Sequence, residues 1–145
     1  MHNPLALEKQ LCFRLYTANK LMTRLYAPVL KSLALTYPQY LVMLVLWDNA
    51  SPILVKELAK RLDLDTGTLS PLLKRLEKQA MITRNRHTED ERSIIVRLTT
   101  QGHELKTAAL HIPKKMFAVT GLSMAQLQDF SQQLDELNKK ISQAI

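Results

Sequence analysis

The chain has 145 residues, of which 46% are hydrophobic, and its 3 glycines and 6 prolines are too few for a turn-rich all-β fold. Its longest apolar run, YLVMLVLW, is far shorter than the roughly 20 residues that cross a bilayer as a helix, and the N-terminus lacks a signal-peptide pattern, so we expect a cytoplasmic protein without membrane contact. The formal net charge of +7 is a moderate positive bias, which permits a nucleic-acid partner without requiring one.

The first predicted element is a long amphipathic helix near the N-terminus. Apolar residues recur along it at spacings of three and four: Leu7, Leu11, Leu15, Ala18, Met22 and Leu25. Asn3 and Pro4 suit its cap and first turn, so we expect the helix to begin there and to run to about Leu33. Pro28 predicts a kink or a division within it.

The second predicted helix follows in TYPQYLVMLVLW. Thr36 and Gln39 have the spacing of a capping box, and Pro38 falls in the first turn, where its missing N–H costs nothing. Because the segment is apolar nearly all round, it should form the buried centre of the fold.

The middle of the chain predicts a winged helix. Residues 53–62 and a stretch beginning near Asp65 carry two short apolar stripes separated by DLDTG, which indicates a helix-turn-helix. The period then changes towards two in MITRNR and SIIVRLT, with the polar turn HTEDE between them, which indicates a β-hairpin. The predicted fold is therefore mainly α with a small β-hairpin.

The C-terminal part predicts further helices. Thr99 or Thr100 can cap a helix through HELKTAAL, and Pro113 interrupts or ends it. After a capping box at Ser123 and Gln126, apolar residues recur near a 3.5-residue repeat: Leu127, Phe130, Leu134, Leu137 and Ile141. Such a narrow stripe favours pairing with a helix of a second chain, and packing within one chain is the alternative. We expect a single subunit with dimerisation helices at about 1–35 and 100–145 and a DNA-binding winged helix at about 36–99.

Two groups of polar residues are candidates for contacting DNA. The second helix of the helix-turn-helix fits a major groove, and its candidates are Thr66, Thr68, Ser70, Lys74 and Arg75. Pro71 predicts a late start or a slight kink in this helix. The candidates on the hairpin are Arg84, Arg86, Asp90 and Arg92, because an arginine at a wing tip can enter the minor groove and a nearby carboxylate can orient it. For any single residue, a solvated surface charge is the alternative.

Two pairs of segments resemble a known family. LDTGTLSPLLKRLEK followed by ITRNRHTEDERSIIVRLTTQG resembles the MarR-type winged-helix repressors. QLCFRLY and LTYPQYLVMLVLW are similar to the organic hydroperoxide resistance regulators and their single-cysteine relatives, over almost the whole chain. The resemblance implies a homodimer that represses transcription from a pseudo-palindromic operator in double-stranded DNA until an organic hydroperoxide oxidises a thiol.

The same resemblance implies a redox site at the only cysteine. Cys12 corresponds to the reactive thiol, Tyr26 and Tyr37 of the partner subunit hydrogen-bond to it, and Tyr16 belongs to the same pocket. Some relatives carry a second, resolving cysteine that this chain lacks. Oxidised Cys12 is therefore expected to be capped by a small cellular thiol, to form a sulfenamide or to oxidise further. We expect the helix dipole to contribute little, because Cys12 would lie about two turns inside the helix.

Other functions compete with this hypothesis. A lone cysteine is commonly a small buried hydrophobe, and a noncovalent ligand in the dimer crevice could release DNA instead. A global single-cysteine redox regulator is a further alternative. A thiol peroxidase is disfavoured because turnover needs a resolving partner, so we do not expect an enzyme. One cysteine and four scattered histidines exclude a disulfide framework and show no metal spacing, so neither a metal nor another cofactor is expected.

Overall fold

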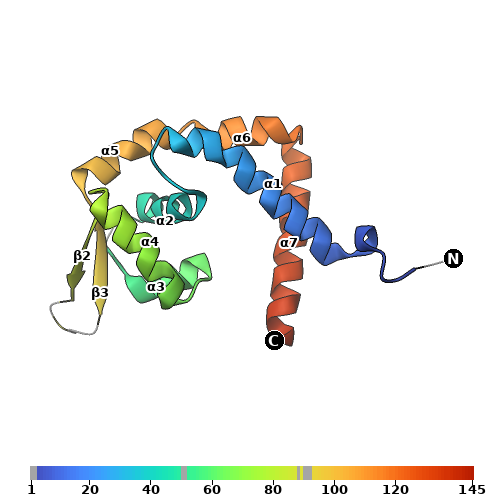
Figure 1. Ribbon diagram of the computed structural model, residues 1–145, viewed down its shortest axis with the longest axis horizontal. Coiled ribbons are helices and arrows are strands. Elements are labelled where there is room, and N and C mark those ends of the chain that lie inside the picture. The colour runs from blue at the N-terminus through green and yellow to red at the C-terminus, as the bar shows by residue number, and fades with distance from the viewer. Residues whose placement is uncertain (1–2, 50–51, 88, 90–92) are drawn as a thin grey trace. The chain divides into compact units, whose positions relative to one another are not determined.

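The computed structural model describes residues 3–49, 52–87, 89 and 93–145. The chain divides into two compact units, Met1–Leu110 and His111–Ile145. The first contains, in chain order (Figure 1), a short 3₁₀ helix η1 (Leu7–Lys9), α1 (Leu11–Lys31), α2 (Tyr37–Asp48), β1 (Ile53–Leu54), α3 (Val55–Leu62), α4 (Thr66–Lys78), β2 (Ile82–Arg86), β3 (Ile94–Leu98) and α5 (Thr100–Ala109). The second contains α6 (Ile112–Thr120) and α7 (Met124–Ala144). Among the described residues, no helix is long and apolar enough to cross a membrane.

The N-terminal helix begins later than the sequence predicts. Asn3 Oδ1 accepts a hydrogen bond from the backbone N–H of Leu5 (3.1 Å), so Asn3 caps only a short turn. Gln10 has an extended backbone, and its side-chain Nε2 donates to the carbonyls of Pro4 (2.8 Å) and Ala6 (2.9 Å). These bonds favour the break, and α1 begins only at Leu11 (Figure 1). The prediction of one helix starting at Asn3 is therefore wrong.

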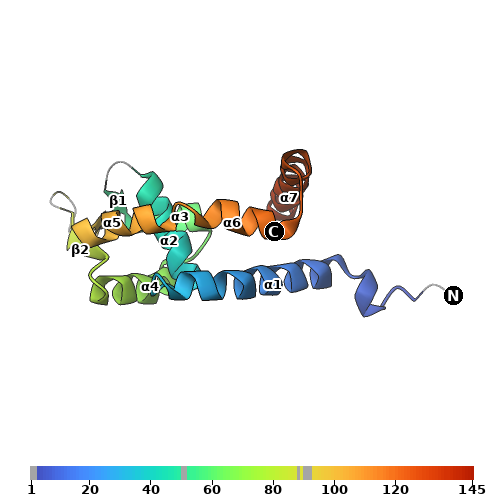
Figure 2. The same ribbon diagram turned by 90° about the horizontal axis from the view of Figure 1, so that it is seen from above.

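α1 ends close to the predicted boundary but without the division predicted at Pro28, and the predictions for α2 are confirmed. α1 continues through Pro28 to Lys31 without division. The capping box of α2 is confirmed: the N–H of Gln39 donates to Thr36 Oγ1 (3.4 Å), and the N–H of Thr36 donates to Gln39 Oε1 (2.9 Å). The predicted burial of α2 is also confirmed, and its buried residues are Gln39, Tyr40, Val42, Met43, Val45, Leu46 and Trp47. In Figure 2, α2 lies between α4 and α5.

The helix-turn-helix is formed by α3 and α4. The turn between them is made by Asp63, which has a left-handed backbone (φ 54°), and Asp65 then caps α4 by accepting from the N–H of Thr68 (2.6 Å). α4 runs from Thr66 through Pro71 without interruption, so the predicted late start is wrong. Pro71 is the sixth residue of the helix, where it removes the bond to the Gly67 carbonyl and its ring crowds that carbonyl.

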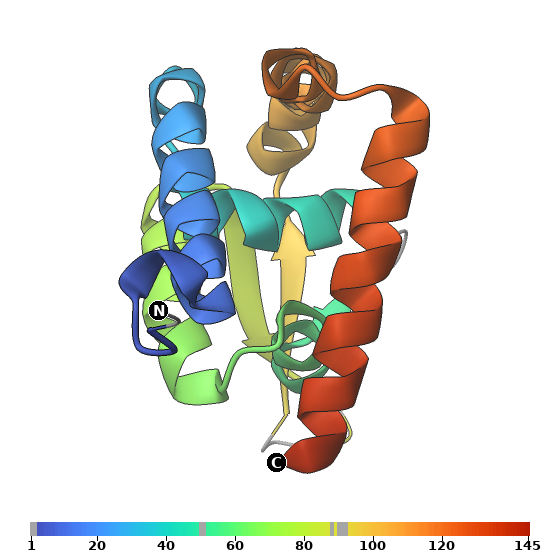
Figure 3. The same cartoon turned by 90° about the vertical axis from the view of Figure 1, so that its right-hand side faces the viewer.

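The predicted hairpin is confirmed, but the sheet has a third strand. β2 and β3 pair antiparallel (Figure 3), with Ile82 opposite Leu98. β1 adds to the free side of β3, with Ile53 opposite Val96, which gives the order β1-β3-β2. A strand of two residues carries no readable period, so the sequence analysis missed β1.

α5 and α7 are capped as expected. Thr99 Oγ1 accepts from the N–H of Gly102 (3.0 Å) and caps α5. α5 ends at Ala109 and α6 begins at Ile112 with Pro113 in its first turn, which confirms the interruption. The capping box of α7 is confirmed as well. No residue of α7 is buried, and the predicted stripe along it includes exposed side chains at Phe130 (51%) and Ile141 (50%).

Candidate functional site

Three tyrosines gather where α1 and α2 meet. Tyr26 of α1 lies edge-on to Tyr37 of α2, with ring centroids 5.3 Å apart. Tyr40 of α2 completes the tyrosine cluster, with its centroid 5.7 Å from that of Tyr26 and 6.4 Å from that of Tyr37. Tyr40 is buried, whereas Tyr26 and Tyr37 are partly exposed. The cluster therefore has one ring in the core and two rings within reach of another molecule.

The phenols of Tyr26 and Tyr40 are stabilised in their neutral form. Burial raises the pKa of Tyr26 and of Tyr40 above the ordinary value of 10.0, and the neighbouring tyrosines raise it further. Neutral phenols are hydrogen-bond donors, so the cluster can donate to an anion brought against it. The sequence analysis did not assign Tyr40 to the site. Its spacing of three from Tyr37 on one helix was the signal that the two rings share a face.

Cys12 lies apart from the tyrosine cluster. It is exposed and is the second residue of α1. Tyr26 lies on the same uninterrupted helix, which places it about 21 Å further along the helix axis at 1.5 Å per residue. Tyr16 lies one turn from Cys12 and is 64% exposed, with Lys20 Nζ 5.6 Å from the centre of its ring. One chain therefore brings Cys12 near Tyr16 but not near Tyr26.

The position of Cys12 in its helix corrects an expectation from the sequence. Because α1 begins at Leu11, Cys12 lies in the first turn and not two turns inside. The first turn of a helix presents backbone N–H groups that favour a negative charge. The sequence analysis expected the helix dipole to contribute little at Cys12. In the structure, the N-terminus of α1 is part of this site.

The candidate DNA-contacting residues of α4 share its exposed side. The leucines of the helix are buried, at positions 69, 72, 73 and 76. All five polar candidates are exposed: Thr66, Thr68, Ser70, Lys74 and Arg75. Asp65, which caps the helix, accepts from Thr68, and this bond lowers the pKa of its carboxyl below the ordinary value of 3.8. α4 thus presents hydroxyls and cations on one face and its leucines on the other.

The hairpin candidates differ from one another. Arg84 Nε and Nη2 donate to the two carboxylate oxygens of Glu77 on α4, at 3.3 and 3.2 Å, and only 24% of the Arg84 side chain is exposed. Arg86 is exposed. Asp90 and Arg92 lie outside the described residues. The structure therefore gives Arg84 an intramolecular role, joining β2 to α4, that the sequence did not reveal.

Two carboxylates predict an acid-sensitive fold. The hydrogen bond and charge of Arg84 lower the pKa of Glu77, as the Thr68 bond lowers that of Asp65. Because both folded-state values lie below the unfolded ones, the stability they contribute is present above about pH 4 and is lost as the pH falls through the folded values. We expect the wild type to lose more free energy of unfolding between pH 6 and pH 3 than Asp65→Asn/Glu77→Gln, in urea titrations. Parallel losses in the two proteins would contradict this assignment.

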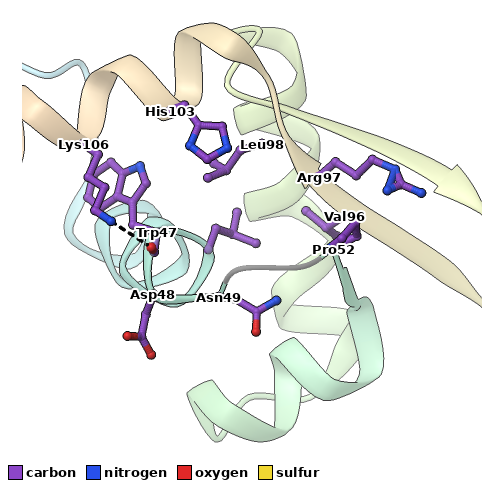
Figure 4. A pocket seen from close by; sticks show the side chains of 10 residues that line it. Trp47, Asp48, Asn49, Pro52, Val96, Arg97, Leu98, His103 and Lys106 are labelled. Atoms are coloured by element: carbon purple, nitrogen blue, oxygen red, sulfur yellow. Dashed lines mark hydrogen bonds between the residues drawn. The ribbon is translucent and has the colours of Figure 1, made fainter.

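A cavity of about 560 Å³ lies where the end of α2 meets β3 and α5 (Figure 4). At its wall, Trp47 Nε1 donates to the carbonyl of Gly102 (2.9 Å), and Lys106 Nζ donates to the carbonyl of Trp47 (3.2 Å). Asp48, which also lines it, is paired with Arg61 at 2.9 Å. Several polar groups of this cavity therefore act within the fold: Trp47 and Lys106 attach α5 to α2, and Asp48 joins α2 to α3.

Comparisons with known proteins agree with this architecture. Residues 24–109 match the family model described as transcriptional regulator SarA/Rot. The chain belongs to this MarR-like family of helix-turn-helix regulators. The match covers the tyrosine cluster, the helix-turn-helix and the sheet, and it confirms the resemblance noted in the sequence.

Individual members of the family are similar over most of their length. The chain is 47% identical over 126 residues to the organic hydroperoxide resistance transcriptional regulator of Bacillus subtilis, covering 87% of this chain and 83% of that protein. It is 38% identical over 132 residues to the regulator MgrA of Staphylococcus aureus, covering 90% and 89%. The solved structure of reduced AbfR bound to DNA is 31% identical, with a TM-score of 0.82, and the match covers 95% of this chain and 94% of that one. The winged-helix fold class is thereby confirmed.

Proposed function

We propose that this protein is a homodimeric DNA-binding repressor that senses organic hydroperoxides by oxidation of Cys12, which releases it from its operator. The observation that carries the proposal is the exposed thiol of Cys12 in the first turn of α1, remote from the tyrosine cluster of its own chain. A second copy of the chain can bring its tyrosine cluster to that thiol. The 47% identity to a hydroperoxide resistance regulator supports this assignment.

Uncovered apolar side chains support a dimer. Along the N-terminal segment and α1, large apolar residues are exposed: Leu5 (86%), Leu7 (53%), Leu11 (54%), Leu21 (55%) and Met22 (40%). α7 adds Phe130 and Ile141. Soluble chains seldom leave so many large apolar side chains uncovered unless another surface packs on them. Because the exposed residues from Leu5 to Met22 surround Cys12 in sequence, the same dimer that covers them would enclose the thiol.

The exposed face of α4 supports DNA binding. Its hydroxyls and cations suit base edges and phosphates in a major groove. AbfR, which shares the fold, has been solved bound to DNA. In a dimer with two-fold symmetry, two copies of α4 would read half-sites about 34 Å apart, which predicts a pseudo-palindromic operator.

The proposed chemistry begins with the thiolate of Cys12. Its sulfur attacks one oxygen of the hydroperoxide, the O–O bond breaks, and the alkoxide leaves and takes up a proton. The sulfur is oxidised by two electrons to sulfenic acid, and the hydroperoxide is reduced to an alcohol. A small cellular thiol then condenses with the sulfenic acid, which forms a mixed disulfide and releases water. Because the chain has one cysteine, a disulfide between two different cysteines of the protein is excluded.

Replacing Cys12 with Ser tests the proposal. We expect Cys12→Ser to bind operator DNA as tightly as the wild type but not to be released by cumene hydroperoxide. In the wild type, the loss of about 3 kcal/mol of binding energy on oxidation would lower affinity more than 100-fold. The measurement is a gel shift with and without hydroperoxide, together with the mass of the peptide containing Cys12.

The same experiment separates the alternatives. Release of the Ser variant by hydroperoxide would exclude the thiol switch. Release of both proteins by a phenolic compound, without a change in mass, would favour a regulator with a noncovalent ligand. Steady consumption of hydroperoxide beyond one equivalent per chain, with a thiol reductant present, would favour a peroxidase.

A further inference from the structure

A buried glutamine lies next to the tyrosine cluster. Gln39 is 4% exposed, and among the described residues it is the only polar or charged residue that is buried. It lies in the first turn of α2, two residues after Tyr37. Its Oε1 accepts from the N–H of Thr36 (2.9 Å), and its Nε2 donates to Oε1 of Gln79 (3.3 Å). Both ends of one planar amide are therefore bonded, which is the condition for burying it.

Gln79 continues this connection from the end of α4. Gln79 is the C-cap of α4, and its backbone N–H donates to the carbonyl of Arg75 (3.1 Å). Its side-chain Nε2 donates to the carbonyl of Ala34 (2.7 Å). Ala34 lies in the turn between α1 and α2 and has a left-handed backbone (φ 56°), which residues other than glycine rarely adopt. We call these three residues, Gln39, Gln79 and Ala34, the glutamine bridge.

The residue after Gln79 ties the end of α4 to a second element. Ala80 also has a left-handed backbone (φ 60°), and its carbonyl accepts from Thr99 Oγ1 (2.6 Å) at the start of α5. The end of α4 is therefore held by side-chain hydrogen bonds on two sides. A shift of the turn between α1 and α2 has to break the glutamine bridge or carry α4 with it.

A cavity beside the bridge leaves room for such a shift. Its volume is about 610 Å³, and its lining includes Thr23 and Ala27 of α1 as well as Tyr37, Gln39 and Gln79. Side chains in a close-packed core have few alternative conformations, so a displacement of one is passed to its neighbours. A side chain next to a cavity has room to adopt a second conformation. Tyr37 is therefore able to move without first opening the core.

We propose that the glutamine bridge couples the tyrosine cluster to α4, with Gln39 and Gln79 as positioning residues of the switch. This inference rests on the proposed function. A change at Cys12 that displaces Tyr37 of the partner subunit moves the first turn of α2 in that subunit. The amide of Gln39, fixed to Thr36 at one end, passes this movement to Gln79 at the other. The end of α4 then shifts, and the two copies of α4 lose the spacing that binding of both half-sites needs.

Replacing Gln79 with Met tests the coupling, because Met has a similar volume and makes neither bond of the bridge. The operator is a duplex that the reduced wild type selects from a random pool. We expect reduced Gln79→Met to bind it within about threefold of the wild type, and Cys12 to be oxidised at an unchanged rate. Oxidation should lower the affinity of the wild type more than about 100-fold and that of the variant less than about tenfold. The readouts are binding titrations of both forms and the mass of the peptide containing Cys12.

Two further variants make the result specific. Gln79→Glu keeps an acceptor for Gln39 Nε2, removes the donor to the Ala34 carbonyl and adds a negative charge beside it. This variant therefore breaks the bridge as well, and it tests the coupling if Gln79→Met does not fold. Gln101→Met is the matched control, because Gln101 is exposed on α5, and it should be released like the wild type. Full release of oxidised Gln79→Met, or of Gln79→Glu in its place, overturns the coupling and leaves the sensing function intact. A wild type that keeps its affinity with Cys12 oxidised overturns the sensing function and the coupling with it.

Discussion

A mixed dimer of Cys12→Ser and Tyr26→Phe/Tyr37→Phe is expected to be oxidised by hydroperoxide about as fast as the wild type. In this dimer the remaining Cys12 belongs to the chain without the two hydroxyls. In the proposed dimer, it would face the intact tyrosines of the Cys12→Ser chain. The reason is the distance of about 21 Å along α1 between Cys12 and Tyr26, which prevents their contact within one chain. The fast rate requires that the tyrosines act across the dimer interface.

The homodimer of Tyr26→Phe/Tyr37→Phe provides the comparison. Phe keeps the ring contacts of the cluster and removes only the hydroxyls. Each hydrogen bond to a charged group is worth about 1.5–3 kcal/mol, so we expect oxidation to slow by on the order of 100-fold. The rates come from the mass of the peptide containing Cys12 over time, with two affinity tags to isolate the mixed dimer. A mixed dimer as slow as the Phe homodimer would place the tyrosines in the same chain as the thiol they serve. A Phe homodimer as fast as the wild type would exclude the hydroxyls from the reaction.

The predictions that succeeded depend on interactions between near neighbours in the chain. The caps at Thr36, Thr99 and Ser123 each bond a residue three positions on, so a short motif contains both partners. The break before α1 is also local, but it depends on the side chain of Gln10, which donates to the carbonyls of preceding residues. The spacing of apolar residues, from which the helix was predicted, contains no information about such polar bonds. That single break moved Cys12 from an interior turn to the first turn of its helix.

The features that the sequence did not reveal join residues far apart in the chain. Gln39 and Gln79 meet across forty positions, and both look like ordinary polar residues of helix ends until the fold brings them together. At Arg84 the sequence indicated a cation for DNA but not the bond to Glu77, and its contact with DNA stays a prediction. The redox candidates were found through a family resemblance, and only the fold shows that Tyr40 joins Tyr26 and Tyr37.

Replacing Gly102 with Ala is expected to destabilise the fold by on the order of 3 kcal/mol, because a Cβ there would overlap the backbone. The added atom would lie 2.2 Å from the carbonyl oxygen of Met81 and 3.1 Å from Cδ2 of Leu98. Neither backbone segment can easily move away from the other. The Met81 carbonyl accepts from the N–H of Thr99 (3.0 Å), and the Gly102 carbonyl accepts from Nε1 of Trp47 (2.9 Å). Relief would therefore require α5 to separate from the end of α2 or from the residue that precedes β2.

Gly67→Ala is the matched control for this experiment. Gly67 is the second residue of α4, and a Cβ there would lie 3.4 Å from its nearest neighbour, Asp65 Oδ1, which is ordinary contact. Since Ala favours helix over Gly by up to about 1 kcal/mol, the control should unfold at the same temperature as the wild type or higher. Gly102→Ala should unfold on the order of 10 °C lower, in thermal scans followed by circular dichroism at one protein concentration. Equal melting of the two variants would show that α5 does not depend on the close approach of Gly102 to Met81. Loss confined to Gly102→Ala would establish that this contact contributes to the attachment of α5 to the winged helix.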